Sequence, residues 1–182
     1  MLNFGQIRER YEEIVGETTS AAYLASVIDE AQAEIAKRFG KREKKNYYPT
    51  KKDSVHDLPE NCLMVNEVRD SQDQLCLDYR VDRGMQISFP GKGHYKLYYT
   101  PVPEPIDYMD NGSKPDVHSI FHNDIVLYCV ARYWQDNAEG IQGEEQKAQM
   151  MMDQFNARVD HSAEILRRNF HEDQVIEFEV WG

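Results

Sequence analysis

The sequence predicts an α+β fold in which a small β insert interrupts a set of helices. Two observations predict it: apolar residues recur at helical spacing toward both ends of the chain, and they alternate with polar residues in its middle. The chain has 182 residues, 41% hydrophobic and 29% charged, values typical of one globular domain. We expect a single domain over 1–182, with 46–106 as the β insert and 170–182 as an extended C-terminal arm.

Two helices are predicted in the N-terminal part. The first covers residues 4–15, and its apolar residues share one face: Phe4, Ile7, Tyr11 and Ile14. Gly16 then interrupts the pattern, and the hydroxyls of Thr18, Thr19 and Ser20 offer N-caps for a second helix. This helix runs to about Phe39 and again carries one apolar stripe.

A second pair of helices is predicted after the insert. The third helix opens at Pro115-Asp116 and runs to about Asn137, with apolar residues on more than one face, so it should be buried on several sides. The fourth runs from about Glu144 to Arg168 with a single stripe. Because a short glycine-containing loop joins them, we expect the two helices to be antiparallel neighbours.

The insert shows the two-residue period of β-strands. Four runs carry the pattern: 62–65, 75–81, 85–89 and 95–99. Turn-like residues, rich in Asp, Gly and Pro, separate the runs. Short sequential turns predict a four-stranded antiparallel meander, and the segment between the helices and this meander is interpreted as a basic linker.

Charge is unevenly distributed along the chain. The 21 Lys and Arg against 32 Asp and Glu give a net charge of −11. Between Lys37 and Lys52, however, eight basic residues stand against one acidic residue, Glu43. So acidic a chain is a poor candidate for non-specific duplex binding, which depends on neutralising phosphates. The basic segment could still contact an acidic partner.

Targeting and redox signals are weak. The longest apolar run is a few residues, far below the roughly 20 that a membrane-spanning helix needs, so we expect no membrane partner. The first residues lack the pattern of a signal peptide. The three cysteines, Cys62, Cys76 and Cys129, have no metal spacing and suit an intracellular chain with free, mostly buried thiols.

Catalytic and metal-binding motifs fail on inspection. His118 and His122 are four residues apart and could share a helical face, but no third ligand is placed by spacing, and exposed or capping histidines are the simpler interpretation. Gly91-Lys92-Gly93 lacks the context of a phosphate loop and fits a hairpin turn. We therefore expect neither an enzyme nor a cofactor, although catalytic groups can also be assembled from distant positions.

Two segments remain as candidate partner-binding sites. The first is the basic segment, with Lys41, Arg42, Lys44 and Lys45; it is either a solvated loop or a contact with an acidic neighbour or nucleic acid. The second is the arm, whose strand-like pattern suits addition to a sheet edge, in this subunit or another. Its candidate residues are Val175, Ile176, Phe178, Val180 and Trp181.

The order of elements resembles the head-to-tail connector (adaptor) proteins of tailed bacteriophages. The closest features are the aromatic-rich helix end Tyr128-Cys129-Val130-Ala131-Arg132-Tyr133-Trp134 and the acidic helix opening Glu144-Glu145-Gln146-Lys147-Ala148 that follows it. The tyrosine-rich stretches Tyr95-Lys96-Leu97-Tyr98-Tyr99-Thr100-Pro101 and Tyr47-Tyr48-Pro49 also look like the insert of this class. The resemblance covers most of the chain as a pattern, without a diagnostic motif.

The resemblance implies a structural protein of the virion, made in the host cytoplasm and placed at the capsid vertex, in the neck. Proteins of this family form a ring, usually a dodecamer, under the portal protein. The ring extends the channel through which genomic DNA passes without specific binding, and it docks the stopper or tail protein. In that setting the helices would form the subunit interfaces, and the arm would dock onto the portal.

Two other classes stay open. A monomeric or dimeric binding module would use the β insert, with exposed aromatics such as Tyr98, to recognise a ligand or protein. An enzyme would need a concave site with converging polar groups. Oligomeric state distinguishes a binding module from a connector. A pocket lined by converging polar groups would indicate an enzyme.

Overall fold

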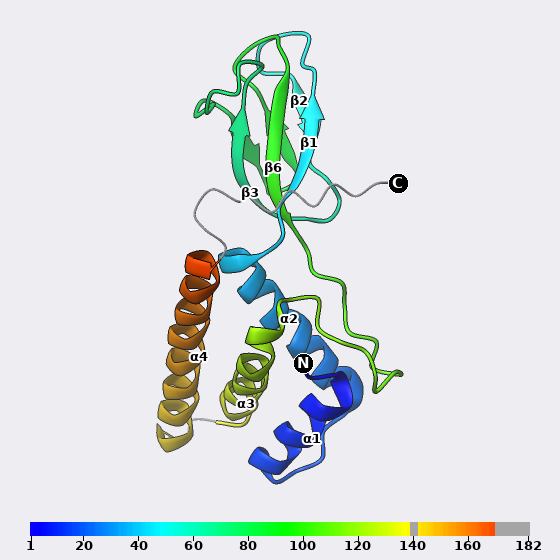
Figure 1. Cartoon of the computed structure of the whole chain (residues 1–182), viewed down its shortest axis with the longest axis vertical. Helices are drawn as coiled ribbons and strands as arrows, with labels where there is room; N and C mark the ends of the chain where they lie inside the picture. Colours follow the sequence, from blue (N-terminus) through cyan, green and yellow to red (C-terminus); the bar gives the residue numbers. More distant parts are fainter. Residues whose placement is uncertain (139–141, 170–182) are drawn as a thin grey trace. The chain divides into compact units, whose positions relative to one another are not determined.

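The computed structural model describes residues 1–138 and 142–169 of the chain. Its fold is α+β, and the described residues form four α-helices and two antiparallel sheets of three strands (Figure 1). The chain divides into two compact units, each with its own hydrophobic core. The helical unit comprises Met1–Phe39 and the described residues from Pro103 onward, and the β unit comprises Gly40–Val102.

Helix α1 spans Phe4–Val15, as its apolar spacing predicts. A capping box fixes its start: Asn3 Oδ1 accepts from Gln6 N at 2.9 Å, and Gln6 Oε1 accepts from Asn3 N at 3.1 Å. Gly16 ends the helix with a φ of 79°, a left-handed conformation that favours glycine. The predicted apolar face is buried except at its last position, because Ile14 is 55% exposed.

Helix α2 spans Ala21–Phe39, also as predicted. Its buried face carries one polar residue, Gln32, which is 1% exposed. Gln32 Oε1 accepts from Asp116 N at 2.5 Å, and Asp29 Oδ1 accepts from Ile106 N at 2.9 Å. These side chains thus satisfy backbone donors of the extended connector that returns the chain to the helical unit, and hold it on α2.

The third helix begins later than predicted. A 3-10 helix, η1 (Ser119–Phe121), precedes α3 (His122–Asn137), whereas the sequence suggested one helix from Pro115. His118 has an extended backbone, with ψ of 138°, and its Nδ1 accepts from Ile120 N at 3.3 Å. The cap is therefore at His118. The expectation that this helix is buried on several sides is confirmed, since α3 packs against α1, α2 and α4.

Helix α4 spans Gln142–Asn169 and lies antiparallel beside α3, as the short loop predicted (Figure 1). Its stripe enters the shared core of the helical unit: Ala148, Phe155, Val159, Ala163 and Leu166 are all buried. One core thus joins all four helices, since α1, α2 and α3 contribute to the same cluster.

The β unit contains six short strands in two sheets (Figure 1). The first sheet has the order β1-β6-β3 and the second β2-β5-β4, with every pairing antiparallel. The strands are β1 (Glu43–Tyr47), β2 (Val55–Asp57), β3 (Cys62–Arg69), β4 (Arg80–Asp82), β5 (Gln86–Ser88) and β6 (Tyr95–Pro101). Their core is aromatic, with Phe89 and Tyr95 stacked at 4.7 Å between ring centroids.

The predicted four-stranded meander is not confirmed. Strands β3 and β6 pair with each other although two other strands separate them in sequence, and periodicity carries no information on such pairing. The run 75–81 is strand only from Arg80, and Leu75 and Leu77 are 57% and 78% exposed. An alternating pattern forms a strand only where a neighbour covers its apolar row.

The basic linker is also corrected, because Glu43–Tyr47 form strand β1. The β unit accordingly begins at Gly40 and ends at Val102, whereas we expected the insert to span 46–106. The segment Glu43–Tyr47 lacks an apolar alternation. Its extended state comes from pairing with β6 and from one buried side chain, Tyr47.

Candidate partner-binding surfaces

The two histidines of the candidate metal pair have separate structural roles. His118 is exposed and caps η1, in line with the simpler interpretation. His122 is 1% exposed, so the expectation that it too is exposed or capping is wrong. Leu2 N donates to His122 Nδ1 at 3.0 Å, and His122 Nε2 donates to Val117 O at 3.2 Å. Across residues 1–138 and 142–169, no three His, Cys, Asp or Glu side chains form a group that could hold a metal ion.

Burial lowers the pKa of His122 below its ordinary value of 6.5, although the carbonyls of Val117 and Leu2 oppose the shift. The unfolded chain therefore takes up a proton below about pH 6.5 before the folded chain does, and stability is lost as the pH falls through that region. We expect the wild type to lose up to about 1.4 kcal/mol per pH unit more than His122→Gln below pH 6.5. Glutamine retains an acceptor for Leu2 and a donor for Val117.

Urea unfolding followed by ellipticity at 222 nm, repeated between about pH 7.5 and 5.5, measures this difference, because all helices of the described chain lie in the helical unit. Equal pH dependence in the two proteins would contradict the assignment of a neutral, buried His122.

The two units differ in the sign of their net charge. Residues 40–102 carry eleven Lys and Arg against nine Asp and Glu, whereas the remainder of the chain carries ten against 23. The net charge of −11 thus belongs to the helical unit and the arm, and the β unit is slightly basic.

The basic segment lies at the start of the β unit. Lys41 and Arg42 precede β1, Lys44 and Lys45 lie on it, and all four are exposed. Its single acidic residue, Glu43, is partly buried instead. Burial and the hydrogen bond that Tyr99 donates to Glu43 Oε2, at 2.5 Å, raise the pKa of the Tyr99 hydroxyl. Glu43 thus accepts a hydrogen bond from a tyrosine of the same sheet, whereas the side chains of Lys41, Arg42, Lys44 and Lys45 are exposed.

Strand β1 is an edge strand. Its one strand neighbour in the described chain is β6, with Lys44 opposite Tyr98 and Tyr47 opposite Tyr95. An edge strand leaves backbone N–H and C=O groups available to another strand, and lysines along it discourage indiscriminate pairing. Lys44 and Lys45 therefore fit two roles, protection of the edge and selection of an acidic strand.

Polar and aromatic side chains share the outer face of the β1–β6 pair. Tyr48 is 66% exposed and stacks on His94, with ring centroids 4.7 Å apart and an interplanar angle of 7°. His94 Nε2 in turn lies 3.2 Å from Asn46 Oδ1. Across the sheet, the Arg69 guanidinium lies 5.8 Å from the Tyr98 ring centroid. This face can offer flat, amphipathic contact area to a partner.

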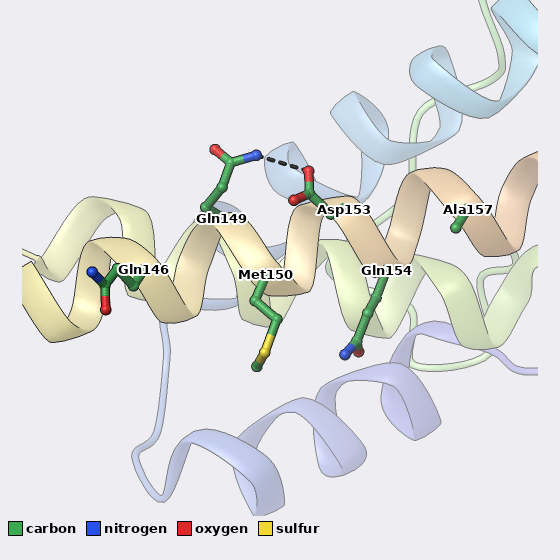
Figure 2. A pocket seen from close by; sticks show the side chains of 6 residues that line it. All are labelled: Gln146, Gln149, Met150, Asp153, Gln154 and Ala157. Atoms are coloured by element: carbon green, nitrogen blue, oxygen red, sulfur yellow. Dashed lines mark hydrogen bonds between the residues drawn. The ribbon is translucent and has the colours of Figure 1, made fainter.

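A depression of about 510 Å³ lies along the solvent side of α4, and Figure 2 shows its lining. All six lining residues come from this one helix and are exposed: Gln146, Gln149, Met150, Asp153, Gln154 and Ala157. The single charged member, Asp153, accepts from Gln149 Nε2 at 2.8 Å (Figure 2). We call these six residues the α4 stripe. A weakly charged stripe on so acidic a chain lets a neighbouring protein approach with little repulsion.

The arm residues Val175, Ile176, Phe178, Val180 and Trp181 lie outside the described residues. The fourth helix extends to Asn169 within the described residues, close to the predicted end at Arg168. No helix in the described part of the chain is both long and apolar enough to span a bilayer.

The chain matches no family model in a scan of known families. A search of curated proteins likewise found no significantly similar sequence.

Sequence reasoning missed three buried polar contacts in the helical unit. It also missed the stacking of Tyr48 on His94 in the β unit. Asp124, for example, is 1% exposed and pairs with Arg158, 34 positions later. Its place among apolar residues of a helix buried on several sides could have marked it as requiring a partner. Nothing in the sequence pointed to Tyr48 and His94, which lie 46 positions apart and meet only through the pairing of β1 with β6.

Proposed function

We propose that this protein is a head-to-tail connector of a tailed bacteriophage virion, a structural protein rather than an enzyme. Copies would form a ring under the portal protein, usually a dodecamer in the family it resembles. The ring would extend the DNA channel at the capsid vertex and dock the stopper or tail protein. The separation of charge between the two units carries this proposal.

Charge separation supports ring formation in particular. The slightly basic β unit and the strongly acidic helical unit carry net charges of opposite sign on one chain. Contact between unlike patches of identical subunits is heterologous, and such contacts close into rings when the rotation between neighbours permits. The same acidic surplus suits a channel through which DNA passes without being held, because carboxylates repel phosphates.

The α4 stripe supports the proposal with a surface for the neighbouring copy. The helical unit carries the acidic surplus, so the helical units of two copies repel each other least where charges are fewest. The stripe spans Gln146 to Ala157, and its Met150 is 53% exposed. Flexible, apolar methionine adapts readily to a partner surface. We assign a subunit contact to this face of α4.

The rival proposal is a binding module that uses its β unit. The exposed Tyr48–His94 stack favours it, since amphipathic aromatic side chains are enriched at binding surfaces. A module of this kind remains a monomer or dimer at every concentration.

Light scattering across concentration and ionic strength tests the connector proposal. We expect the mass to exceed the 21.3 kDa of one chain by several-fold at low salt and to fall as salt screens the charges. Negative-stain images of the low-salt sample should show rings. A constant mass of one or two chains under all these conditions would contradict assembly and favour the module.

A matched pair of substitutions locates the contact. Met150→Glu places a negative charge within the α4 stripe, and His161→Glu places one at another exposed position of the same helix. Met150→Glu should shift the assembly midpoint to about tenfold higher protein concentration, whereas His161→Glu should leave it nearly unchanged. Equal shifts would mean that net charge, rather than this face of α4, controls association.

A further inference from the structure

We propose that the β unit binds single-stranded nucleic acid where two of its loops meet, with a base stacked on Tyr48 and phosphates on the lysines beside it. The loops are 48–54, between β1 and β2, and 89–94, between β5 and β6. The inference concerns the β unit alone and is independent of the connector proposal. Three observations support it: an exposed pair of stacked rings, three lysines on the same loops, and a further tyrosine on the same sheet face.

The two loops are held together by their backbones. Gly93 N donates to Pro49 O at 3.2 Å, and Asp53 N donates to Phe89 O at 3.0 Å. Such bonds fix segments that lie about 40 positions apart in the sequence. Side chains from both loops therefore contribute to one surface of the β unit.

The rings offer a flat surface for a base. Tyr48 is 66% exposed, and its ring lies almost parallel to that of His94, which covers one of its faces. His94 Nε2 lies 3.2 Å from Asn46 Oδ1, so the histidine ring is held from its edge. A base laid on the other face of Tyr48 would extend this stack. Stacking of one base on an aromatic side chain typically strengthens binding about 5- to 150-fold.

The charge beside the rings is positive. Lys51, Lys52 and Lys92 are all exposed, and none of them forms a salt bridge with a described residue. Each lies within four positions of Tyr48 or His94, at most about 14 Å along the backbone. The two loops contain a single acidic residue, Asp53. These lysines are therefore available to phosphates.

The same face of the sheet carries a further tyrosine. Tyr98 follows His94 by four positions, about 13 Å along the strand direction, and lies on the same side of β6. The buried side chains of Leu97 and Tyr99 face the opposite side. Lys44, the partner of Tyr98 in register, is exposed. A strand of several nucleotides can thus meet a second ring and a further cation beyond the first stacked base.

Rings and cations together select single strands. A duplex keeps its bases stacked on one another, so it can use the lysines and not the face of Tyr48. An acidic peptide likewise satisfies the lysines but brings no planar group for the ring. Unstacked bases on a phosphate backbone match both features, and stacking of this kind is tolerant of sequence.

Fluorescence anisotropy of a dye-labelled oligothymidylate of about twelve nucleotides tests the proposal. At about 50 mM salt we expect a dissociation constant of about 10–100 μM for the full chain. Tyr48→Ala should weaken binding at least about fivefold, whereas Tyr48→Trp, which keeps a flat ring, should retain it. Tyr108→Ala is the matched control, because Tyr108 is 44% exposed and lies in the helical unit, and it should leave the affinity unchanged.

A pair of lysine substitutions tests the charge. Lys92→Gln and Lys114→Gln each remove one exposed positive charge, but Lys114 lies in the helical unit. Lys92→Gln should weaken binding and reduce the slope of log affinity against log salt by about 0.7, the effect of one lost phosphate contact on a single strand. Lys114→Gln should change neither quantity.

The proposal is overturned if the oligonucleotide shows no binding at about 1 mM protein, or if Tyr48→Ala and Tyr108→Ala bind equally well. Tighter binding of a duplex than of the single strand would overturn it in favour of a purely electrostatic site. Equally effective competition by polyglutamate would overturn it in favour of an acidic protein partner. Ring formation, measured separately by scattering, can fail or succeed without changing these results.

Discussion

Replacement of Phe155 by alanine should lower the free energy of unfolding of the helical unit by about 3–5 kcal/mol. The ring is 1% exposed and lies 4.9 Å from the Tyr128 ring, measured between centroids, at an angle of 65°. The Arg38 guanidinium lies over the same ring, 5.8 Å from its centroid. Truncation leaves a cavity lined by three helices, because Phe155 is on α4, Tyr128 on α3 and Arg38 on α2.

Urea unfolding monitored at 222 nm measures the loss. Met150→Ala is the matched control on the same helix: Met150 is 53% exposed, and its truncation should change stability by no more than about 0.5 kcal/mol. If the two variants lost equal stability, the helical unit would lack the tightly packed core described for it.

The helices were predictable because their signals are local. Capping residues and apolar residues three or four positions apart lie within one or two turns, as Asn3 with Gln6 and Phe4 with Ile7 illustrate. The late start of α3 shows the limit of this reasoning. Its N-terminal signal, Pro115-Asp116, lies in the extended connector, where Gln32 on α2 accepts from the Asp116 backbone. A contact 84 positions away thus outweighs local propensity.

The sheets were only partly predictable, for the same physical reason. Strands β5 and β6 carry alternating patterns that a core covers, and the sequence located both. Leu75 and Leu77 alternate equally well, yet they are exposed, and in the described chain their run meets β3 only at the isolated bridge between Leu75 and Arg69. Lys44 and Lys45 show no such pattern and still form a strand, since β6 supplies the hydrogen bonds.

The candidate surfaces were likewise predictable only in part. Exposure and positive charge of Lys41, Arg42, Lys44 and Lys45 followed from composition, because clustered cations are rarely buried. That two of them lie on an open sheet edge depends on strand order, which no local pattern encodes. Buried polar groups were missed altogether, since each is satisfied by a residue far away in sequence.

Replacement of Arg158 by alanine should destabilise the helical unit by about 2–3 kcal/mol near neutral pH. Arg158 Nε donates to Asp124 Oδ1 at 2.8 Å, and the Asp124 side chain is 2% exposed. Without the guanidinium, a carboxylate stays buried with no cation to balance it. The expected loss is below that of a fully buried pair, because Arg158 itself is 58% exposed and already partly solvated.

The loss should shrink in acid. Burial raises the pKa of Asp124, and Arg158 opposes that shift, so removal of the arginine raises the pKa further. A carboxyl group whose folded pKa exceeds its unfolded pKa destabilises the fold when it is ionised. That penalty disappears as the pH falls through the folded pKa and the group takes up a proton. The gap between Arg158→Ala and the wild type should therefore be smaller near pH 5 than near pH 7.5.

A double-mutant cycle with Asp124→Asn isolates the pair. Asparagine removes the negative charge and nearly preserves the shape, so Arg158→Ala should cost far less in the Asp124→Asn background than in the wild type. The four proteins are compared by urea unfolding at 222 nm near both pH values. An equal cost of Arg158→Ala in both backgrounds would mean that the arginine stabilises α4 by the packing of its methylene groups, and that Asp124 tolerates burial without it.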